Sequence, residues 1–208
     1  HYPQLETKLN VRGRDLDEVR RNLAPVEAEV RRRLGNFILA EDDGRLEGVI
    51  LDALRARGET LCVAETFTGG GLSARIAPLP GAESVLLRSV AARSLPQLFD
   101  AAGLPAEEAP PEATVEAAAS VAARLRARAG ASHALGVLIQ LDEGEDRIEF
   151  GGTVCIAIAG TAGVVTRRAR MLGGREWIRL GATELGLDCL RRLLQGLPID
   201  ERIDFEKD

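Results

Sequence analysis

Residues 60–71 read TLCVAETFTGGG, an apolar run that ends in an acid, a hydroxyl and three glycines. Its apolar first half predicts a strand over 60–64, and the residues after the glycines predict a helix over about 70–77. Backbone N–H groups at the start of a helix attract anions, and glycine lets a ligand approach closely. The turn therefore predicts an anion site built from Thr68, Gly69, Gly70 and Gly71. A tight turn required by close packing accounts for the glycines equally well, since the stretch contains neither a Walker A loop nor a GxGxxG pattern.

On either side of this turn, predicted helices alternate with predicted strands. The patterns predict strands over 84–91, 133–141, 148–159 and 164–171, and helices over 46–54, 95–102, 112–129 and 175–194. The last two strands form an antiparallel hairpin, and the last helix is long and amphipathic. We therefore expect residues 42–197 to form an α/β domain, a three-layer α/β/α sandwich with a mixed sheet.

The first part of the chain carries a different pattern. Residues 4–12 alternate polar and apolar side chains as a strand does, 16–34 carry apolar residues at helical spacing, and 36–40 form a second short strand. Pro25 is expected to kink the helix or split it in two. Residues 1–41 are thus predicted to form a small α+β module that precedes the larger domain.

Composition narrows the possible functions. The net charge of −5 argues against a nucleic-acid binder. Two histidines, His1 and His133, cannot make a multi-histidine metal site, and we predict neither a metal nor a cofactor. The three cysteines lie far apart without a CxxC pair, which favours buried thiols in a cytoplasmic protein. No apolar run is long enough to span a membrane, and residues 198–208 are predicted to be a loose acidic tail. Because the chain starts at His1 rather than Met, we expect a fragment of a longer protein.

A family resemblance extends from the glycine turn along most of the chain. Residues 61–83, LCVAETFTGGGLSARIAPLPGAE, resemble the opening of the C-terminal domain of CinA proteins, whose motif reads A-E-S-C-T-G-G-x-x-A followed by Pro-Gly. Residues 151–157, GGTVCIA, look like the family's V-G-T-V-x-I-A strand. Residues 173–179, GGREWIR, look like the G-D-R-x-x-I-R start of its last helix. The matches are collinear and cover roughly residues 42–197, which makes the resemblance far more specific than one motif.

The resemblance also covers the first part of the chain. Residues 1–41 resemble the small KH-type module that precedes this domain in full-length CinA proteins. The module contains no GxxG loop, so we infer no RNA binding from it. The family further implies an upstream domain similar to molybdopterin-binding folds. It also implies a homodimer, since related domains associate in pairs.

The family includes nicotinamide-nucleotide amidases, in which a serine attacks a carboxamide with help from the Tyr and Lys of a V-x-Y-S-N-x-x-K segment. At the three matching positions this chain has Thr66, Ala92 and Gln97. Phe67 replaces the small residue that follows the serine. Tyr2 is the only tyrosine and Lys8 and Lys207 are the only lysines, so a small shift of the alignment does not restore the pair. The family's T-G-I-A-G-P turn matches residues 138–143, LIQLDE, whose acids would repel a phosphate.

We therefore expect a degenerate CinA C-terminal domain without amidase activity, which serves as an interaction, oligomerisation or nucleotide-sensing module of a longer CinA-like protein. The alternative is an active nicotinamide mononucleotide deamidase with Thr66 as nucleophile and Glu65 as base. Glu65 also suits a structural carboxylate that accepts backbone N–H bonds. A third possibility is a nucleotide pocket with Arg175 and Arg179 as phosphate partners, although salt bridges on a helix face account for both arginines equally well. Phe67 is expected to fill space that an active site would keep open.

Overall fold

The computed structural model describes residues 4–142, 151–202 and 206–207. The chain divides into two compact units, His1–Arg45 and Leu46–Asp208. Tyr2, Glu143 of the segment 138–143 and the first residues of the strand predicted over 148–159 lie outside the described residues.

The described part of the first unit is built on one long helix, α1 (Leu16–Leu34). Asp15 begins the helix, because its side chain accepts a hydrogen bond from the Glu18 N–H at 2.8 Å. Pro25 lies inside the helix, which continues through it, so the predicted split is wrong. Proline removes one N–H donor, but the Leu, Ala, Glu and Arg residues around it are strong helix formers and keep the remaining bonds.

The two short strands predicted on either side of α1 are wrong. Residues 4–13 have no regular secondary structure, and Gly35–Phe37 form a short 3₁₀ helix, η1. A strand needs a partner for its N–H and C=O groups, which alternation of side chains does not supply. None of the residues described between 4 and 45 is buried. The described part of this unit is therefore helical rather than α+β, and it has no core of its own.

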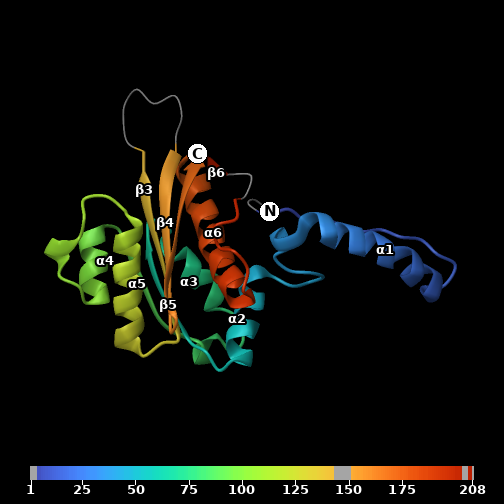
Figure 1. The fold of residues 1–208 in the computed structure, drawn as a ribbon, viewed down its shortest axis with the longest axis horizontal. Coiled ribbons are helices and arrows are strands. Elements are labelled where there is room, and N and C mark those ends of the chain that lie inside the picture. Colours follow the sequence, from blue (N-terminus) through green and yellow to red (C-terminus); the bar gives the residue numbers. More distant parts are fainter. Residues whose placement is uncertain (1–3, 143–150, 203–205, 208) are drawn as a thin grey trace. The chain divides into compact units, whose positions relative to one another are not determined.

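The second unit is a sheet covered by helices (Figure 1). In chain order, its elements are α2 (Leu46–Ala56), β1 (Leu61–Thr66), α3 (Gly71–Ile76), η2 (Ala82–Ser84), β2 (Leu86–Ala92), α4 (Leu95–Ala102), η3 (Ala106–Glu108), α5 (Val115–Ala129), β3 (His133–Leu141), β4 (Gly151–Gly160), β5 (Gly163–Leu172), α6 (Arg175–Gln195) and β6 (Glu206–Lys207). The strands lie in the order β2-β1-β3-β4-β5-β6. β1 is parallel to β2 and β3, and every pair from β3 to β6 is antiparallel. The predicted mixed sheet and its hairpin are thus confirmed.

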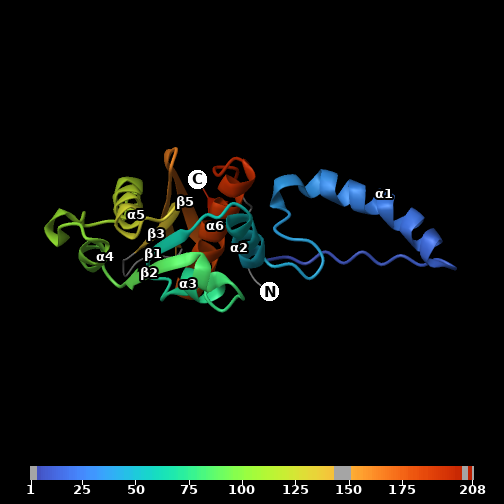
Figure 2. The ribbon, with the colours of Figure 1, turned by 90° about the horizontal axis from the view of Figure 1, so that it is seen from below.

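Helices cover both faces of this sheet, which confirms the predicted three-layer sandwich. Figures 1 and 2 show α4 and α5 on one face, and α2, α3 and α6 on the other. The alanines of α5 let this helix lie close to the sheet, and its buried residues are Ala117, Ala118, Val121, Ala122 and Leu125. Gly136 of β3 completes the approach, because a Cβ there would lie 3.0 Å from the Ala118 carbonyl oxygen. Within the described ranges, no helix is both long enough and apolar enough to cross a membrane.

The last helix, α6, differs from its predicted amphipathic form. Every residue from Gly181 to Arg192 is buried, so the helix is enclosed on all sides and not only on the sheet face. The enclosed charged residues include Asp188, Arg191 and Arg192. A helix in this position must pair its charges internally, because water cannot solvate them.

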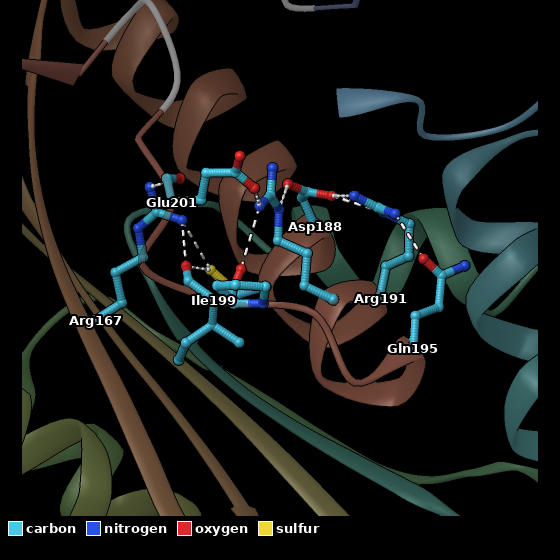
Figure 3. Close-up of polar contacts among 9 residues, drawn as sticks. Arg167, Asp188, Arg191, Gln195, Ile199 and Glu201 are labelled. Carbon is cyan, nitrogen blue, oxygen red and sulfur yellow. Dashed lines mark hydrogen bonds and ion pairs between the residues drawn. The ribbon is translucent and has the colours of Figure 1, made fainter. Parts of the chain in front are cut away.

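The C-terminal tail is held to the domain where it is described (Figure 3). Arg167 of β5 donates to the carbonyl oxygens of Ile199 and Glu201, and Arg192 donates to the Glu201 carboxylate at 2.5 Å. The chain then adds β6 to the edge of β5. The predicted loose tail is therefore wrong for 198–202, because buried arginines bind the main chain of a segment whose own composition is polar.

Candidate functional site

The predicted site lies at the carboxyl ends of the three parallel strands. The chain leaves β1 for β2 on one side, and β3 pairs with the other side of β1. Such a switch point is where open α/β sheets bind ligands. Thr66 pairs in register with Ala92 of β2, and Gln97 lies in the first turn of α4, after its N-cap Ser94. The structure thus brings the predicted nucleophile and the two lost family positions to one edge of the sheet.

Glu65 is fully buried and accepts four hydrogen bonds. Its carboxylate receives the Thr68 hydroxyl at 2.5 Å, the Leu72 N–H at 3.0 Å, the Ser73 N–H at 3.3 Å and the Ser73 hydroxyl at 2.9 Å. Leu72 and Ser73 belong to the first turn of α3, whose N–H groups have no partner within the helix. An internal carboxylate therefore already binds the Thr68 hydroxyl and the Leu72 and Ser73 N–H groups at the start of this helix.

The Thr66 hydroxyl is also committed to the main chain. The residue is buried, and its Oγ1 accepts the Ile139 N–H of β3 at 2.9 Å. The pairing of β1 with β3 ends at Glu65 and Val137, so the hydroxyl supplies the acceptor that a longer strand would provide. Among the described residues, no basic side chain is hydrogen-bonded to this hydroxyl. A threonine without an adjacent base lacks the activation that a nucleophile needs.

Phe67 does not fill a closed space. Its ring is half-buried, and the Arg175 guanidinium carbon lies 6.0 Å from the ring centroid. The backbone at Phe67 has a φ of 64°, which a bulky side chain rarely adopts and which costs on the order of 1–3 kcal/mol. The strained residue follows Thr66 directly. The chain therefore turns sharply after β1 even though Phe67 is bulky.

The glycines of the turn have separate structural uses. Gly69 and Gly70 have φ values of 69° and 86°, in the left-handed region that glycine adopts without strain. Gly71 lies against α6, where a Cβ would meet the Thr183 Oγ1 at 2.9 Å. The glycines are therefore explained by the turn and by the close packing of α3 on α6.

Gly71→Ala should lower the free energy of unfolding by about 1–3 kcal/mol, because the added methyl forces α3 and α6 apart. Gly48→Ala is the matched control, since a Cβ at Gly48 meets nothing within 4 Å and this glycine lies inside α2. The control should gain about 0.5–1 kcal/mol from helix propensity. Urea denaturation measures both variants. Equal effects would show that the contact between Gly71 and Thr183 does not limit packing.

The two arginines predicted as phosphate partners behave differently. Arg179 binds Glu176 through Nε at 2.8 Å and Nη2 at 2.6 Å, and its Nη1 reaches the Thr68 carbonyl at 3.5 Å. The hydrogen bonds that Arg179 donates to Glu176 raise the pKa of Arg179 and lower the pKa of Glu176. Arg179 is thus engaged in a salt bridge on the helix face. Arg175 is exposed above Phe67.

The acidic segment after β3 is partly neutralised. Asp142 accepts two hydrogen bonds from Arg170 of β5, at 3.2 and 2.7 Å. This pairing offsets the repulsion that the sequence predicted for an approaching anion. Glu143 lies outside the described residues.

Cys62 and Cys155 do not offer another nucleophile. Burial raises the pKa of the Cys62 thiol, and it raises the pKa of Cys155 to about 11. Both thiols are therefore protonated at neutral pH, and a protonated thiol is a weak nucleophile. In the parts of the chain that the structure covers, no cluster of three or more side chains could hold a metal ion.

Sequence reasoning missed the residues that support the turn from within the domain. Arg75 of α3 donates to Glu47 of α2 at 2.6 Å and to Glu184 of α6, and it links three helices. The Ser73 hydroxyl donates to Glu65 of the turn, and Thr183 of α6 lies close against Gly71. A sequence signal for these contacts exists. Each contact is made by a polar residue in a helix with apolar residues three or four positions away, which places it on the buried face.

The fold and this edge of the sheet can now be compared with known proteins. A family model described as the CinA C-terminal domain matches residues 43–194. The chain belongs to the CinA family. The match includes β1, the glycine turn, β2 and nearly all of α6, so the turn described above lies within the part of the chain that matches the family.

Relatives and solved structures agree with this assignment. A CinA-like protein of Frankia casuarinae is 35% identical over 200 residues, which cover 95% of this chain and 46% of that protein. A CinA-like protein of Geotalea uraniireducens is 30% identical over 207 residues, which cover 98% of this chain and 49% of that protein. A solved CinA superfamily structure from Klebsiella pneumoniae 700603 has a TM-score of 0.61 at 26% identity, and the match covers 72% of this chain and 96% of that one. The chain spans about half the length of the curated relatives it matches.

Proposed function

We propose that this CinA domain does not hydrolyse carboxamides and that it acts as an interaction, oligomerisation or nucleotide-sensing module of a longer CinA-like protein. The observation that carries the proposal is that the Thr66 hydroxyl is bound to the main chain and has no catalytic partner beside it among the described residues. The hydroxyl is buried and accepts the Ile139 N–H, while Ala92 and Gln97 stand where the family resemblance places a tyrosine and a lysine. Acid–base assistance of this kind contributes about 100- to 10,000-fold to a reaction.

No other residue of the second unit supplies the tyrosine and the lysine that are replaced at positions 92 and 97. This unit contains no tyrosine, and its one lysine is Lys207. Lys207 belongs to β6, which lies four strands from β1. At about 4.8 Å per strand, this separation is roughly 19 Å, far beyond the reach of a hydrogen bond.

The active deamidase remains the alternative, with Thr66 as nucleophile and Glu65 as base. It is less favourable because Glu65 is fully buried and accepts two backbone N–H groups and two hydroxyls. Nucleotide sensing has some support from Arg175, whose exposed guanidinium group above Phe67 is suited to a phosphate. We further infer a cytoplasmic setting from the three buried thiols, and a KH-type character for residues 1–41 from their sequence pattern.

Nicotinamide mononucleotide incubated with the chain should release no ammonia above the uncatalysed background, and Thr66→Ala should leave this result unchanged. Thr66→Ser should also be inactive, because it restores a primary hydroxyl without a base. Ammonia is measured together with the acid product. Turnover by the unmodified chain that Thr66→Ala abolishes would overturn the proposal.

A combined variant tests the reason for the inactivity. Thr66→Ser with Ala92→Tyr and Gln97→Lys restores the three family positions at the edge where the structure brings them together. Ammonia release by the triple variant and by none of the single variants would assign the loss of activity to these side chains. A thermal shift assay of the unmodified chain with nicotinamide mononucleotide tests nucleotide sensing. A raised melting temperature would support a sensing module, and an unchanged one would favour a module that binds no nucleotide.

A further inference from the structure

The segment that follows α6, residues 198–202, lies along the second unit as a short strap. Two buried arginines of this unit bind it. Arg167 of β5 donates to the main-chain carbonyl oxygens of Ile199 and Glu201, the second at 2.9 Å. Arg192 of α6 donates to the Glu201 carboxylate at 2.5 Å, and Figure 3 shows Arg167 beside Ile199 and Glu201. Side chains on one strand and one helix thus hold the strap by polar bonds.

The strap is joined to α6 at a glycine. Gly196 has a φ of 70°, and its N–H donates to the Leu193 carbonyl oxygen at 3.1 Å. The Leu197 N–H donates to the Arg192 carbonyl oxygen at 2.8 Å. These two bonds complete the last turn of α6 with residues that precede the strap. The strap can therefore move away at Gly196 without unwinding the helix.

The strap buries little apolar surface of its own. Pro198 and Asp200 are exposed, and Ile199 is only half-buried. By contrast, every residue of α6 from 181 to 192 is buried. Segments with few buried apolar contacts open locally at a lower free energy than the core does. The strap therefore belongs to the part of the second unit that should open first.

Glu201 joins the strap to both arginines. Its main-chain carbonyl oxygen accepts from Arg167, and its carboxylate accepts from Arg192. The Arg192 side chain is 0% exposed and that of Glu201 is 35% exposed, so solvent screens this ion pair only from one side. A hydrogen bond between charged groups is stronger than one between neutral groups. The Glu201 carboxylate is therefore the contact whose loss should release the strap most readily.

The thiol of Cys189 lies under the strap. Its Sγ is 3.7 Å from the Ile199 carbonyl oxygen and 3.8 Å from Nη1 of Arg167, and the residue is fully buried. Cys62 and Cys155 belong to a different part of the core, packed with residues of α4 and α5 on the other face of the sheet. Movement of the strap would thus uncover Cys189 and leave Cys62 and Cys155 covered.

We propose that residues 198–202 are a gate, a strap that opens at Gly196 while the rest of the second unit stays folded. Its opening admits small molecules to the Cys189 thiol and to the Arg167 guanidinium group beside it. Glu201 keeps the strap closed through its ion pair with Arg192. The inference goes beyond the proposed function and does not depend on whether Thr66 is catalytic.

Alkylation of the full chain by iodoacetamide, followed residue by residue with peptide mass spectrometry, tests whether the opening is local. Cys189 should react about tenfold faster than Cys62 and Cys155, because local opening needs less free energy than global unfolding. Urea at about 1 M should hardly change the Cys189 rate but should raise the other two, since the effect of urea scales with the surface exposed. Equal rates with equal urea dependence would show that only global unfolding uncovers Cys189, and would overturn the strap.

A pair of variants tests the role of Glu201. Glu201→Ala should raise the Cys189 rate by about tenfold, because the strap loses a charged hydrogen bond that is partly screened by solvent. Asp200→Ala is the matched control, since it removes the same charge from the exposed neighbouring residue, and it should leave the rate unchanged. The rates of Cys62 and Cys155 in both variants report the stability of the whole unit and should also stay unchanged.

Three results would contradict the assignment of Glu201. An unchanged Cys189 rate in Glu201→Ala would show that its carboxylate does not hold the strap. Equal acceleration by Asp200→Ala would assign the effect to the charge of the segment rather than to the bond with Arg192. Equal acceleration at Cys189, Cys62 and Cys155 would show a general loss of stability. Ammonia release from nicotinamide mononucleotide is measured separately, so failure of the strap leaves the proposed function untouched.

Discussion

Asp188→Ala should lower the free energy of unfolding by about 3–5 kcal/mol, the range found when one partner of a buried ion pair is removed. Asp188 accepts the Arg191 Nε at 2.7 Å and the Arg192 Nε at 2.8 Å, and the three side chains are between 0% and 6% exposed. Figure 3 shows Asp188 beside Arg191 within this network. Without the carboxylate, two guanidinium groups stay buried with only part of their charge compensated. Urea denaturation, monitored through the single tryptophan Trp177 on α6, measures the loss.

The same helix offers a matched control. Glu176 binds Arg179 three residues further on, with the spacing that joins Asp188 to Arg191, but its side chain is 65% exposed. Glu176→Ala should leave the urea midpoint close to that of the unmodified chain, because solvent screens an exposed pair. If both substitutions shift the midpoint equally, burial does not set the strength of these ion pairs.

Replacing both partners distinguishes stabilisation by the ion pair from the cost of leaving a charge alone. Asp188→Leu with Arg191→Met removes the carboxylate and one guanidinium, while Arg192 keeps Glu201 as a partner. The double variant should be more stable than Asp188→Ala, since fewer buried charges lack a partner. A double variant that loses the sum of the two single effects would show that Asp188 and Arg191 act independently.

The sequence predicts the second unit well because its signals are local. Apolar periodicity, N-caps and glycines define each element within a few residues, and α4 and β3 begin and end at the predicted residues. The helix predicted from residue 112 begins instead at Val115, because Thr114 is its N-cap and accepts the Ala117 N–H. Such shifts of an element's first residue are small. The apolar pattern identifies the helix, and the capping residue determines where it begins.

The errors arise where contacts come from distant parts of the chain. The segments on either side of α1 have the composition of strands, but among the described residues they pair with no strand. The tail is polar in sequence, yet Arg167 and Arg192, which bind it, come from β5 and α6. No local pattern reveals that a polar segment will meet a buried arginine.

The candidate site was predictable in position and only partly in chemistry. The sequence placed Glu65, Thr66 and the glycines on one turn, and the structure places Ala92 and Gln97 at the same edge. That Ile139 would bind the Thr66 hydroxyl could not be foreseen, because it depends on where the pairing of β1 with β3 ends.

Glu65→Gln should lower the free energy of unfolding by about 3 kcal/mol. The carboxylate accepts hydrogen bonds on both oxygens, and hydrogen bonds to a charged group contribute about 1.5–3 kcal/mol each. An amide offers one oxygen, and its NH₂ group must face either the Leu72 N–H or the Ser73 N–H, which are both donors. Glu83→Gln is the control, since Glu83 is exposed and the same substitution there should leave the urea midpoint unchanged.

The Glu65 variant also decides between its two possible roles. A catalytic base replaced by an amide loses activity while the fold keeps its stability, because its proton transfer matters only during the reaction. A carboxylate that closes the glycine turn loses stability whether or not any substrate is present. Full stability of Glu65→Gln together with loss of ammonia release from nicotinamide mononucleotide would therefore favour the deamidase. A large loss of stability in a chain that never released ammonia is the result expected if Glu65 fills, from within, the place where an anion would otherwise bind.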